Sequence, residues 1–226
     1  MRYKGILFDV DMTLFDFDAG NRISVNQLLD EVGYRSPNRF DEYEAVNKAC
    51  WAALERGEMT QGELRYARFR RFFRQYGIAA DPDAAADRFV TLLGQQAILM
   101  PRAEETAHRI AAVKPIALLT NGISAVQRNR LARSPMKDIA VDMIVSEEVG
   151  VAKPHPGLFN FALKKLGWNR RETLMIGDGA TSDIAGANAA AIDACWLNPA
   201  GLSLPKGVHA EYIVKDLTDC VEIALR

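Results

Sequence analysis

The stretch that most constrains the fold is the segment Gly5–Leu14, in which a short apolar run ends in two aspartates. The run Ile6–Phe8 predicts a buried strand, because a continuous apolar run bounded by turn signals is typical of a parallel sheet. Asp9 and Asp11 follow it directly. A carboxylate at the end of a buried strand is costly unless a cation, a proton or another partner compensates its charge. The pair therefore indicates a site for a cation or a reacting group, with an Asp-rich turn as the plainer alternative.

From about residue 99 onward, strand-like and helix-like patterns alternate. Predicted strands cover 115–119, 143–145, 173–176, 193–197 and 211–214. Predicted helices cover about 103–113, 124–133, 157–166, 182–190 and 217–225. This alternation is typical of βαβ units, whose strands form a parallel sheet. We therefore predict a doubly wound parallel-sheet α/β core made of residues 1–16 and 99–226.

The segment 17–98 has no strand-like run and predicts an all-helical insert. We expect Asp18 to cap its first helix, and helical patterns then cover about 40–57, 60–76 and 83–97. Thr60 and Glu63 have the Thr-x-x-Glu spacing of a capping box. Because the insert begins just after the Asp9/Asp11 strand end, we expect it to act as a lid over that edge.

Polar residues recur near the ends of the later predicted strands. They are Thr120, Lys153 just before a strand–helix junction, Asp178, and Asp183 at the start of a helix. Ligands of open α/β sheets bind beyond the carboxyl ends of the strands, so we expect these side chains to meet the first two aspartates. Four carboxylates and one lysine carry a charge of about −3, which favours a divalent cation. Oxygen ligands of this kind suit Mg²⁺.

The same edge offers donors for a phosphoryl group. Thr120 supplies a hydroxyl, and Asn121 and Gly122 supply backbone N–H groups near a helix start, which is a common anion site. Lys153 adds a positive charge. The residues thus combine a carboxylate nucleophile, a cation site and phosphate ligands.

These motifs resemble those of the haloacid-dehalogenase-like phosphohydrolase superfamily over the whole core. Asp9-Val10-Asp11-Met12-Thr13 resembles its Asp-x-Asp-x-Thr motif, and Thr120 resembles its second motif. Lys153 within Val151–Pro156 resembles the third, and Gly177-Asp178 through Ser182-Asp183 the fourth, acidic motif. The helical insert is similar to the helical cap of that superfamily.

The resemblance implies a role for each residue. Asp9 would attack phosphorus and form an aspartyl-phosphate, and Asp11 would protonate the leaving oxygen and then take a proton from water. Asp9, the Asp11 backbone carbonyl and Asp178 would hold Mg²⁺. Thr120 and Lys153 would bind the phosphoryl group, and Asp183 would orient Lys153 or a metal-bound water.

The stretch Leu14-Phe15-Asp16-Phe17-Asp18 looks most like the pyrimidine 5′-nucleotidase branch of this superfamily. Met12 departs from it, because an acidic residue is expected there. The resemblance implies a Mg²⁺-dependent phosphatase whose substrate is a small phosphate ester, and we expect a pyrimidine nucleoside 5′-monophosphate.

Three alternatives remain open. A phosphosugar phosphatase or phosphosugar mutase of the same superfamily shares the first aspartate pair. A receiver-type signalling domain also uses Asp, Thr, Lys and Mg²⁺, but needs neither Asp11 nor an insert. A dehalogenase is disfavoured, because Asp11 supplies a leaving-group acid that carbon–halogen cleavage does not need.

Composition narrows the function classes further. The formal net charge of −1 gives no case for nucleic acid or an anionic membrane. Three cysteines without paired spacing indicate reduced thiols, and with no signal-peptide pattern or membrane-length apolar run we expect a soluble, cytoplasmic protein. We interpret the basic stretch from Arg65 to Arg74 as the solvated face of an amphipathic helix. The oligomeric state is not predicted.

Overall fold

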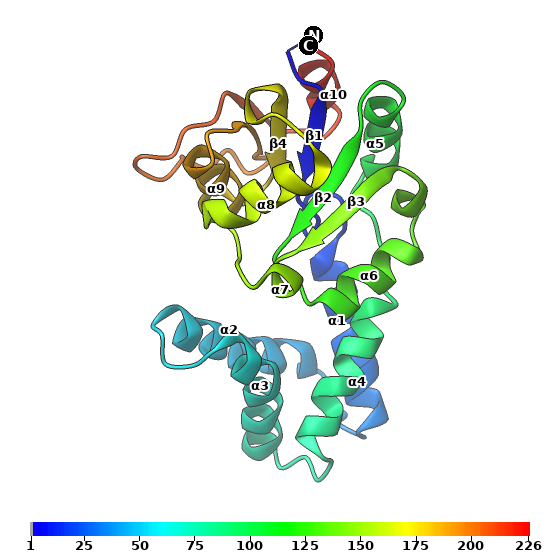
Figure 1. Ribbon diagram of the computed structural model, residues 1–226. Coiled ribbons are helices and arrows are strands. Elements are labelled where there is room, and N and C mark those ends of the chain that lie inside the picture. Colours follow the sequence, from blue (N-terminus) through cyan, green and yellow to red (C-terminus); the bar gives the residue numbers. More distant parts are fainter. Residues whose placement is uncertain (1) are drawn as a thin grey trace. The chain divides into compact units, whose positions relative to one another are not determined.

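The computed structural model describes residues 2–226 and divides the chain into two compact units. The core unit runs through Phe17 and resumes with Ala97–Arg226, and the insert unit is Asp18–Gln96. Figure 1 shows the sheet of the core unit and the helices of the insert unit. Across the described residues, no helix has both the length and the apolar character needed to cross a lipid bilayer.

A six-stranded sheet forms the centre of the core unit. Its strands are β1 (Gly5–Phe8), β2 (Ile116–Thr120), β3 (Ala140–Val145), β4 (Thr173–Gly177), β5 (Asp193–Leu197) and β6 (Tyr212–Val214). They lie in the order β3-β2-β1-β4-β5-β6, and every neighbouring pair is parallel. The chain adds strands on one side of β1 and then crosses to the other, which makes the sheet doubly wound as predicted.

Helices cover both faces of this sheet (Figure 1). They are α5 (Ala103–Ala111), α6 (Ser124–Ala132), α7 (Ser146–Val149), α8 (Pro156–Leu166), α9 (Ala185–Ala189) and α10 (Asp219–Ala224). Alternate residues of β1 enter two separate apolar clusters: Ile6 and Phe8 pack in the one that contains α5 and α10, and Leu7 packs with α8 and α9. Because β1 is buried on both faces and lies between β2 and β4, Asp9 and Asp11, which follow it, are placed at the middle of the sheet edge.

The helix expected at 182–190 differs from the prediction. Its first turn is a π-helical turn, Ala180–Ile184, and α9 begins only at Ala185. The backbone N–H groups of Asp183 and Ile184 both donate to the Gly179 carbonyl, at 2.7 and 3.2 Å. The Asp183 carboxylate in turn accepts the Gly179 N–H at 2.9 Å. The π-helical turn therefore directs the Asp183 side chain toward the end of β4.

The insert unit consists of four helices: α1 (Phe17–Glu31), α2 (Arg39–Glu55), α3 (Gln61–Tyr76) and α4 (Pro82–Gly94). The capping box predicted at Thr60 is confirmed, since Thr60 and Glu63 exchange side-chain and backbone hydrogen bonds. The C-terminal stop of α3 is Gly77, with a left-handed φ of 66°. The prediction for Asp18 is wrong, because α1 already begins at Phe17 and Asp18 lies inside its first turn.

The solvated face predicted for the basic stretch needs one correction, at Arg68. Arg65 and Arg70 form exposed ion pairs with Asp87 and Asp83. Arg68 instead is buried, and its guanidinium lies over the rings of Phe69 and Phe89, at 5.2 and 4.8 Å from their centres. The flat, weakly hydrated guanidinium packs on aromatic faces in a way that helical spacing alone does not reveal.

All three cysteines are free and buried, as expected for reduced thiols.

Candidate active site

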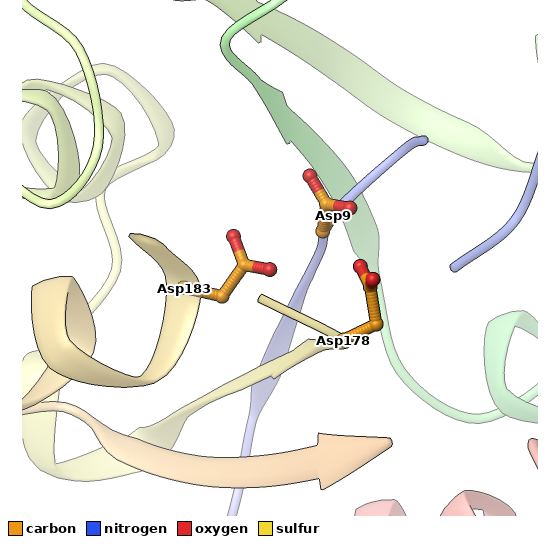
Figure 2. A group of neighbouring side chains, drawn as sticks. All are labelled: Asp9, Asp178 and Asp183. Carbon is orange, nitrogen blue, oxygen red and sulfur yellow. The ribbon is translucent and has the colours of Figure 1, made fainter. Parts of the chain in front are cut away.

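The predicted site residues gather at the carboxyl edge of the sheet, at the point where the strand order reverses. Asp9 follows β1 and Asp178 follows β4, and these two strands are neighbours. Asp183 comes from the π-helical turn after β4. Figure 2 shows the three carboxylates pointing toward one another from these elements, and one oxygen of each lies within 4.8 Å of the others.

Lys153 lies among these carboxylates and is itself buried. Its ammonium group forms ion pairs with Asp9 and with Asp183, the latter at 2.7 Å, and donates to the Leu119 carbonyl at 2.9 Å. These three acceptors match the three protons of an ammonium group. Burial would lower the pKa of Lys153, but the two carboxylates outweigh it and raise that pKa above its usual value. Lys153 therefore carries its charge in the site.

Thr13 is a site residue to which the sequence reading assigned no role. Its buried hydroxyl lies 3.2 Å from an Asp9 oxygen and 3.1 Å from an Asp178 oxygen, and it accepts the Asp178 N–H at 3.1 Å. It thus links the ends of β1 and β4. The signal for this role was present in the sequence, since Thr13 closes the Asp-x-Asp-x-Thr motif.

The carboxylates in this cluster resist ionisation. Burial is the main cause that raises the pKa of Asp9 to about 7, with a further contribution from Asp183 that Lys153 opposes. Burial and then the charge of Asp9 raise the pKa of Asp178 to about 6. Burial also raises the pKa of Asp183. One lysine does not compensate the charge of two buried carboxylates and the half-buried Asp178, so the cluster favours additional positive charge.

A divalent cation fits this donor set. Mg²⁺ takes oxygen ligands and is commonly held by one or two carboxylates together with substrate phosphate and water. The two oxygens of Asp183 already face Lys153 and the Gly179 N–H. Asp9 and Asp178 are therefore the better candidates for direct ligands, with Asp183 in a supporting place.

The predicted phosphate ligands lie at the end of β2. The buried Thr120 hydroxyl accepts the Gly122 N–H at 3.0 Å. The Asn121 side chain accepts the Lys153 N–H at 2.8 Å and donates to the Lys153 carbonyl at 2.9 Å, which ties the two loops together. Two of the groups expected to bind phosphate thus already have protein partners: the Gly122 N–H serves Thr120, and Asn121 positions Lys153.

Asp11 lies beside a pair of residues from α6 that the sequence reading missed. Its carboxylate forms an ion pair with Arg130 and accepts a hydrogen bond of 2.7 Å from the Gln127 amide. Both α6 residues are about 1% exposed, whereas the Asp11 side chain is 29% exposed. A glutamine and an arginine inside a helix carry no local signal that could have identified them.

Met12, between Asp11 and Thr13, adopts a left-handed conformation with a φ of 63°. A residue with a side chain is uncommon there and costs of order 1 kcal/mol or more. Its N–H donates to the Phe15 carbonyl at 2.8 Å, which closes a tight turn. This turn is how Asp9, Asp11 and Thr13 leave one strand end yet have side chains in one small region.

Comparison with known proteins gives the class to which this site belongs. A family model described as haloacid dehalogenase-like hydrolase matches residues 3–191. The chain therefore belongs to the haloacid dehalogenase-like hydrolase family, as its four motifs indicated.

Relatives with curated names narrow the class. Pyrimidine 5′-nucleotidase PynA of Streptococcus pneumoniae is 35% identical over 228 residues, which cover 98% of this chain and 96% of PynA. Pyrimidine 5′-nucleotidase YjjG of Escherichia coli is 32% identical over 224 residues, 99% of this chain and 98% of YjjG. The crystal structure of the putative hydrolase YfnB of Bacillus subtilis, bound to magnesium, has a TM-score of 0.90 at 29% identity and covers 99% of both chains. With the family, these relatives make the chain a phosphoric monoester hydrolase.

Proposed function

We propose that this hydrolase cleaves pyrimidine nucleoside 5′-monophosphates to nucleoside and phosphate, with Mg²⁺ as cofactor and an aspartyl-phosphate on Asp9 as intermediate. The observation that carries the chemistry is the convergence of Asp9, Asp178 and Asp183, of which Asp9 and Asp183 form ion pairs with Lys153. The two pyrimidine 5′-nucleotidases that align over nearly the whole chain support the substrate class.

In the first half-reaction an Asp9 oxygen attacks phosphorus, and the bond to the leaving oxygen breaks as that oxygen takes a proton from Asp11. Lys153 favours the ionised form of the attacking carboxylate, in opposition to burial, and with Thr120 neutralises charge on the phosphoryl oxygens. Bound Mg²⁺, held by Asp9, the Asp11 carbonyl and Asp178, would supply the further positive charge that the phosphoryl group and the nucleophile share.

In the second half-reaction Asp11 takes a proton from water, which attacks the phosphoenzyme and releases phosphate from Asp9. Asp183 positions Lys153 in both steps through their ion pair. We also propose that the helical insert acts as a lid that excludes water during the first half-reaction.

Chelation tests the metal requirement. EDTA should abolish turnover of p-nitrophenyl phosphate, and added Mg²⁺ should restore it. Asp9→Asn should lose both turnover and the covalent phosphate detected by mass spectrometry, while Asp138→Asn, an exposed position of the core unit, is the matched folding control. Full activity in chelator would contradict the metal role, and a stable phosphoprotein without turnover would favour a receiver-type domain.

Substrate class is tested by kcat/KM across UMP, dUMP, dTMP, AMP, GMP and several hexose phosphates. A site that pairs the polar edge of a pyrimidine rejects molecules without that edge strongly, whereas one methyl group is worth only about 1–3 kcal/mol. We therefore expect UMP, dUMP and dTMP to lead together. A hexose phosphate or purine nucleotide ahead by about tenfold would overturn the nucleotide assignment and leave the phosphatase intact. Conversion of a hexose phosphate to its isomer with a bisphosphate primer would indicate a mutase.

A further inference from the structure

Two buried side chains of α6, Gln127 and Arg130, contact the Asp11 carboxylate. We infer that Gln127 and Arg130 of α6 are positioning residues that hold the Asp11 carboxylate where it serves the leaving group and the attacking water. The inference rests on the proposed role of Asp11 as the acid–base group.

Each oxygen of the Asp11 carboxylate has its own donor on α6. Arg130 Nη1 forms an ion pair with Oδ1, and Gln127 Nε2 donates to Oδ2 at 2.7 Å. Gln127 Oε1 accepts from Arg130 Nη1 at 3.1 Å, so the two donors are also joined to each other. Donors on both oxygens fix the rotation of a carboxylate, which a single ion pair leaves free. Residues three apart share one helix face, which lets both reach one carboxylate.

Gln127 also contacts Thr120, one of the predicted phosphate ligands. Its amide nitrogen carries two protons, of which one faces Asp11 and the other the Thr120 hydroxyl, at 2.9 Å. Gly122 makes room for it, since a side-chain carbon at that position would lie 2.2 Å from the Gln127 amide nitrogen. The side-chain amide of Gln127 therefore links Asp11, the acid–base group, directly to Thr120, a predicted phosphate ligand.

The Arg130 side chain is itself fixed by packing and burial. Its guanidinium lies over the Phe15 ring, 4.7 Å from the centre, and the side chain is 1% exposed. Burial of a guanidinium is costly unless charge and hydrogen bonds compensate it, and Asp11 supplies compensating charge here. The Asp11 side chain stays 29% exposed. A carboxylate has about four lone-pair positions, so two donors leave room for the proton it transfers.

A purely structural ion pair would also anchor α6 to the end of β1, and leaving-group dependence separates the two roles. A nucleoside leaves as an alkoxide that needs a proton, whereas p-nitrophenolate leaves well without one. For Arg130→Met and Gln127→Leu we expect kcat/KM for UMP to fall by about 10²-fold, the low end of a general-acid contribution, and for p-nitrophenyl phosphate to fall far less. Arg130→Lys should lie between these variants and wild type. Arg128→Met, on the exposed side of α6, is the matched control and should change neither.

A double-mutant cycle completes the test. If Arg130 acts through Asp11, Asp11→Asn with Arg130→Met should be no slower toward UMP than Asp11→Asn alone. Additive losses, or equal losses on both esters in folded variants, would overturn the inference. If Arg130→Met does not fold, Gln127→Leu and Arg130→Lys carry the same comparison.

The proposed function is judged separately, by wild-type turnover of p-nitrophenyl phosphate with Mg²⁺. If wild type cleaves that ester but not UMP, only the substrate proposal fails, and glycerol 2-phosphate replaces UMP as the alkyl ester.

Discussion

Lys153 illustrates at the scale of one residue how this site is stabilised, since it faces two buried carboxylates and a carbonyl. Removal of one partner from a buried charge pair leaves uncompensated charge, which costs about 3–5 kcal/mol. We expect Lys153→Met to lower the free energy of unfolding by about that amount in urea titrations at neutral pH with EDTA. Lys164→Met, on the exposed side of α8, should stay within about 0.5 kcal/mol of wild type. Equal stability of the two variants would show that the Lys153 pairs are not needed for folding.

The raised pKa values of Asp9 and Asp178 predict how the stability of the metal-free protein depends on pH. Burial raises their pKa values, to about 7 and about 6, so the folded chain binds protons more tightly than the unfolded chain. Their contribution to stability is thus complete below about pH 4 and is lost as pH rises toward 7. In EDTA, we expect the melting temperature of wild type relative to Asp178→Asn to fall between about pH 4 and pH 6 and to level off above that range, because only the Asp178 contribution differs between the two proteins.

Mg²⁺ should reverse that decline, because a bound cation favours the ionised carboxylates. Its stabilising effect in wild type should be larger at pH 8 than at pH 5. A difference between wild type and Asp178→Asn that rises with pH in EDTA would contradict the raised pKa values.

Thr13 has a testable role as the link between Asp9 and Asp178. Thr13→Val keeps the shape but removes the hydroxyl, so both carboxylates lose an orienting partner. Loss of a group that orients metal ligands typically weakens metal binding about 10–100-fold. We expect the Mg²⁺ concentration for half-maximal activity to rise by that factor, while Thr13→Ser stays near wild type. An unchanged Mg²⁺ requirement in Thr13→Val would show that the hydroxyl serves packing alone.

At the scale of elements, capping residues determine where two helices of the insert unit, α3 and α4, begin. The capping box at Thr60 starts α3, and Asp81 starts α4 by accepting the N–H groups of Asp83 and Ala84. Thr60→Ala should destabilise the protein by about 1 kcal/mol, because a backbone N–H at the start of α3 loses its acceptor. Hydrogen exchange of α3 amides should report this loss, and Thr60→Ser should restore protection. Equal loss in both variants would mean that the hydroxyl does not cap the helix.

At the scale of the whole molecule, the core unit has its own apolar clusters. The residues that form the cores on the two faces of the sheet all belong to the core unit. The chain leaves and re-enters this unit through one antiparallel bridge, between Phe15 and Leu99, with a hydrogen bond of 2.9 Å from the Asp16 N–H to the Ile98 carbonyl. The insert is thus attached at two adjacent points.

We therefore expect a variant in which a short Gly/Ser linker replaces residues 18–96 to fold. Its unfolding in urea should be cooperative, and Mg²⁺ should raise its melting temperature. The same variant with Asp178→Asn is the control for the metal effect. An unfolded protein at all Mg²⁺ concentrations would show that the core unit needs the insert.

The sequence alone determined much of this fold, because its signals are local. Strand-like runs, glycines and caps specify elements through backbone sterics and nearby hydrogen bonds. Parallel strands then bring their carboxyl ends to one edge of the sheet, so the sequence alone predicts that Asp9, Thr120 and Asp178 lie close together. The capping box at Thr60 and the parallel order of the strands were predicted on these grounds.

Only the tertiary structure decided which polar side chains are buried and what they face. Arg130 and Gln127 have the helical spacing of ordinary surface residues, and their burial depends on Asp11 and Phe15, more than 100 positions away in the chain. Arg68 likewise packs on Phe89, which belongs to another helix. The ion pair between Asp183 and Lys153 also joins residues 30 positions apart, from the π-helical turn after β4 and the loop before α8. The physical reason is that charge compensation in a buried site is a property of several chain segments at once, so no single segment carries its signal.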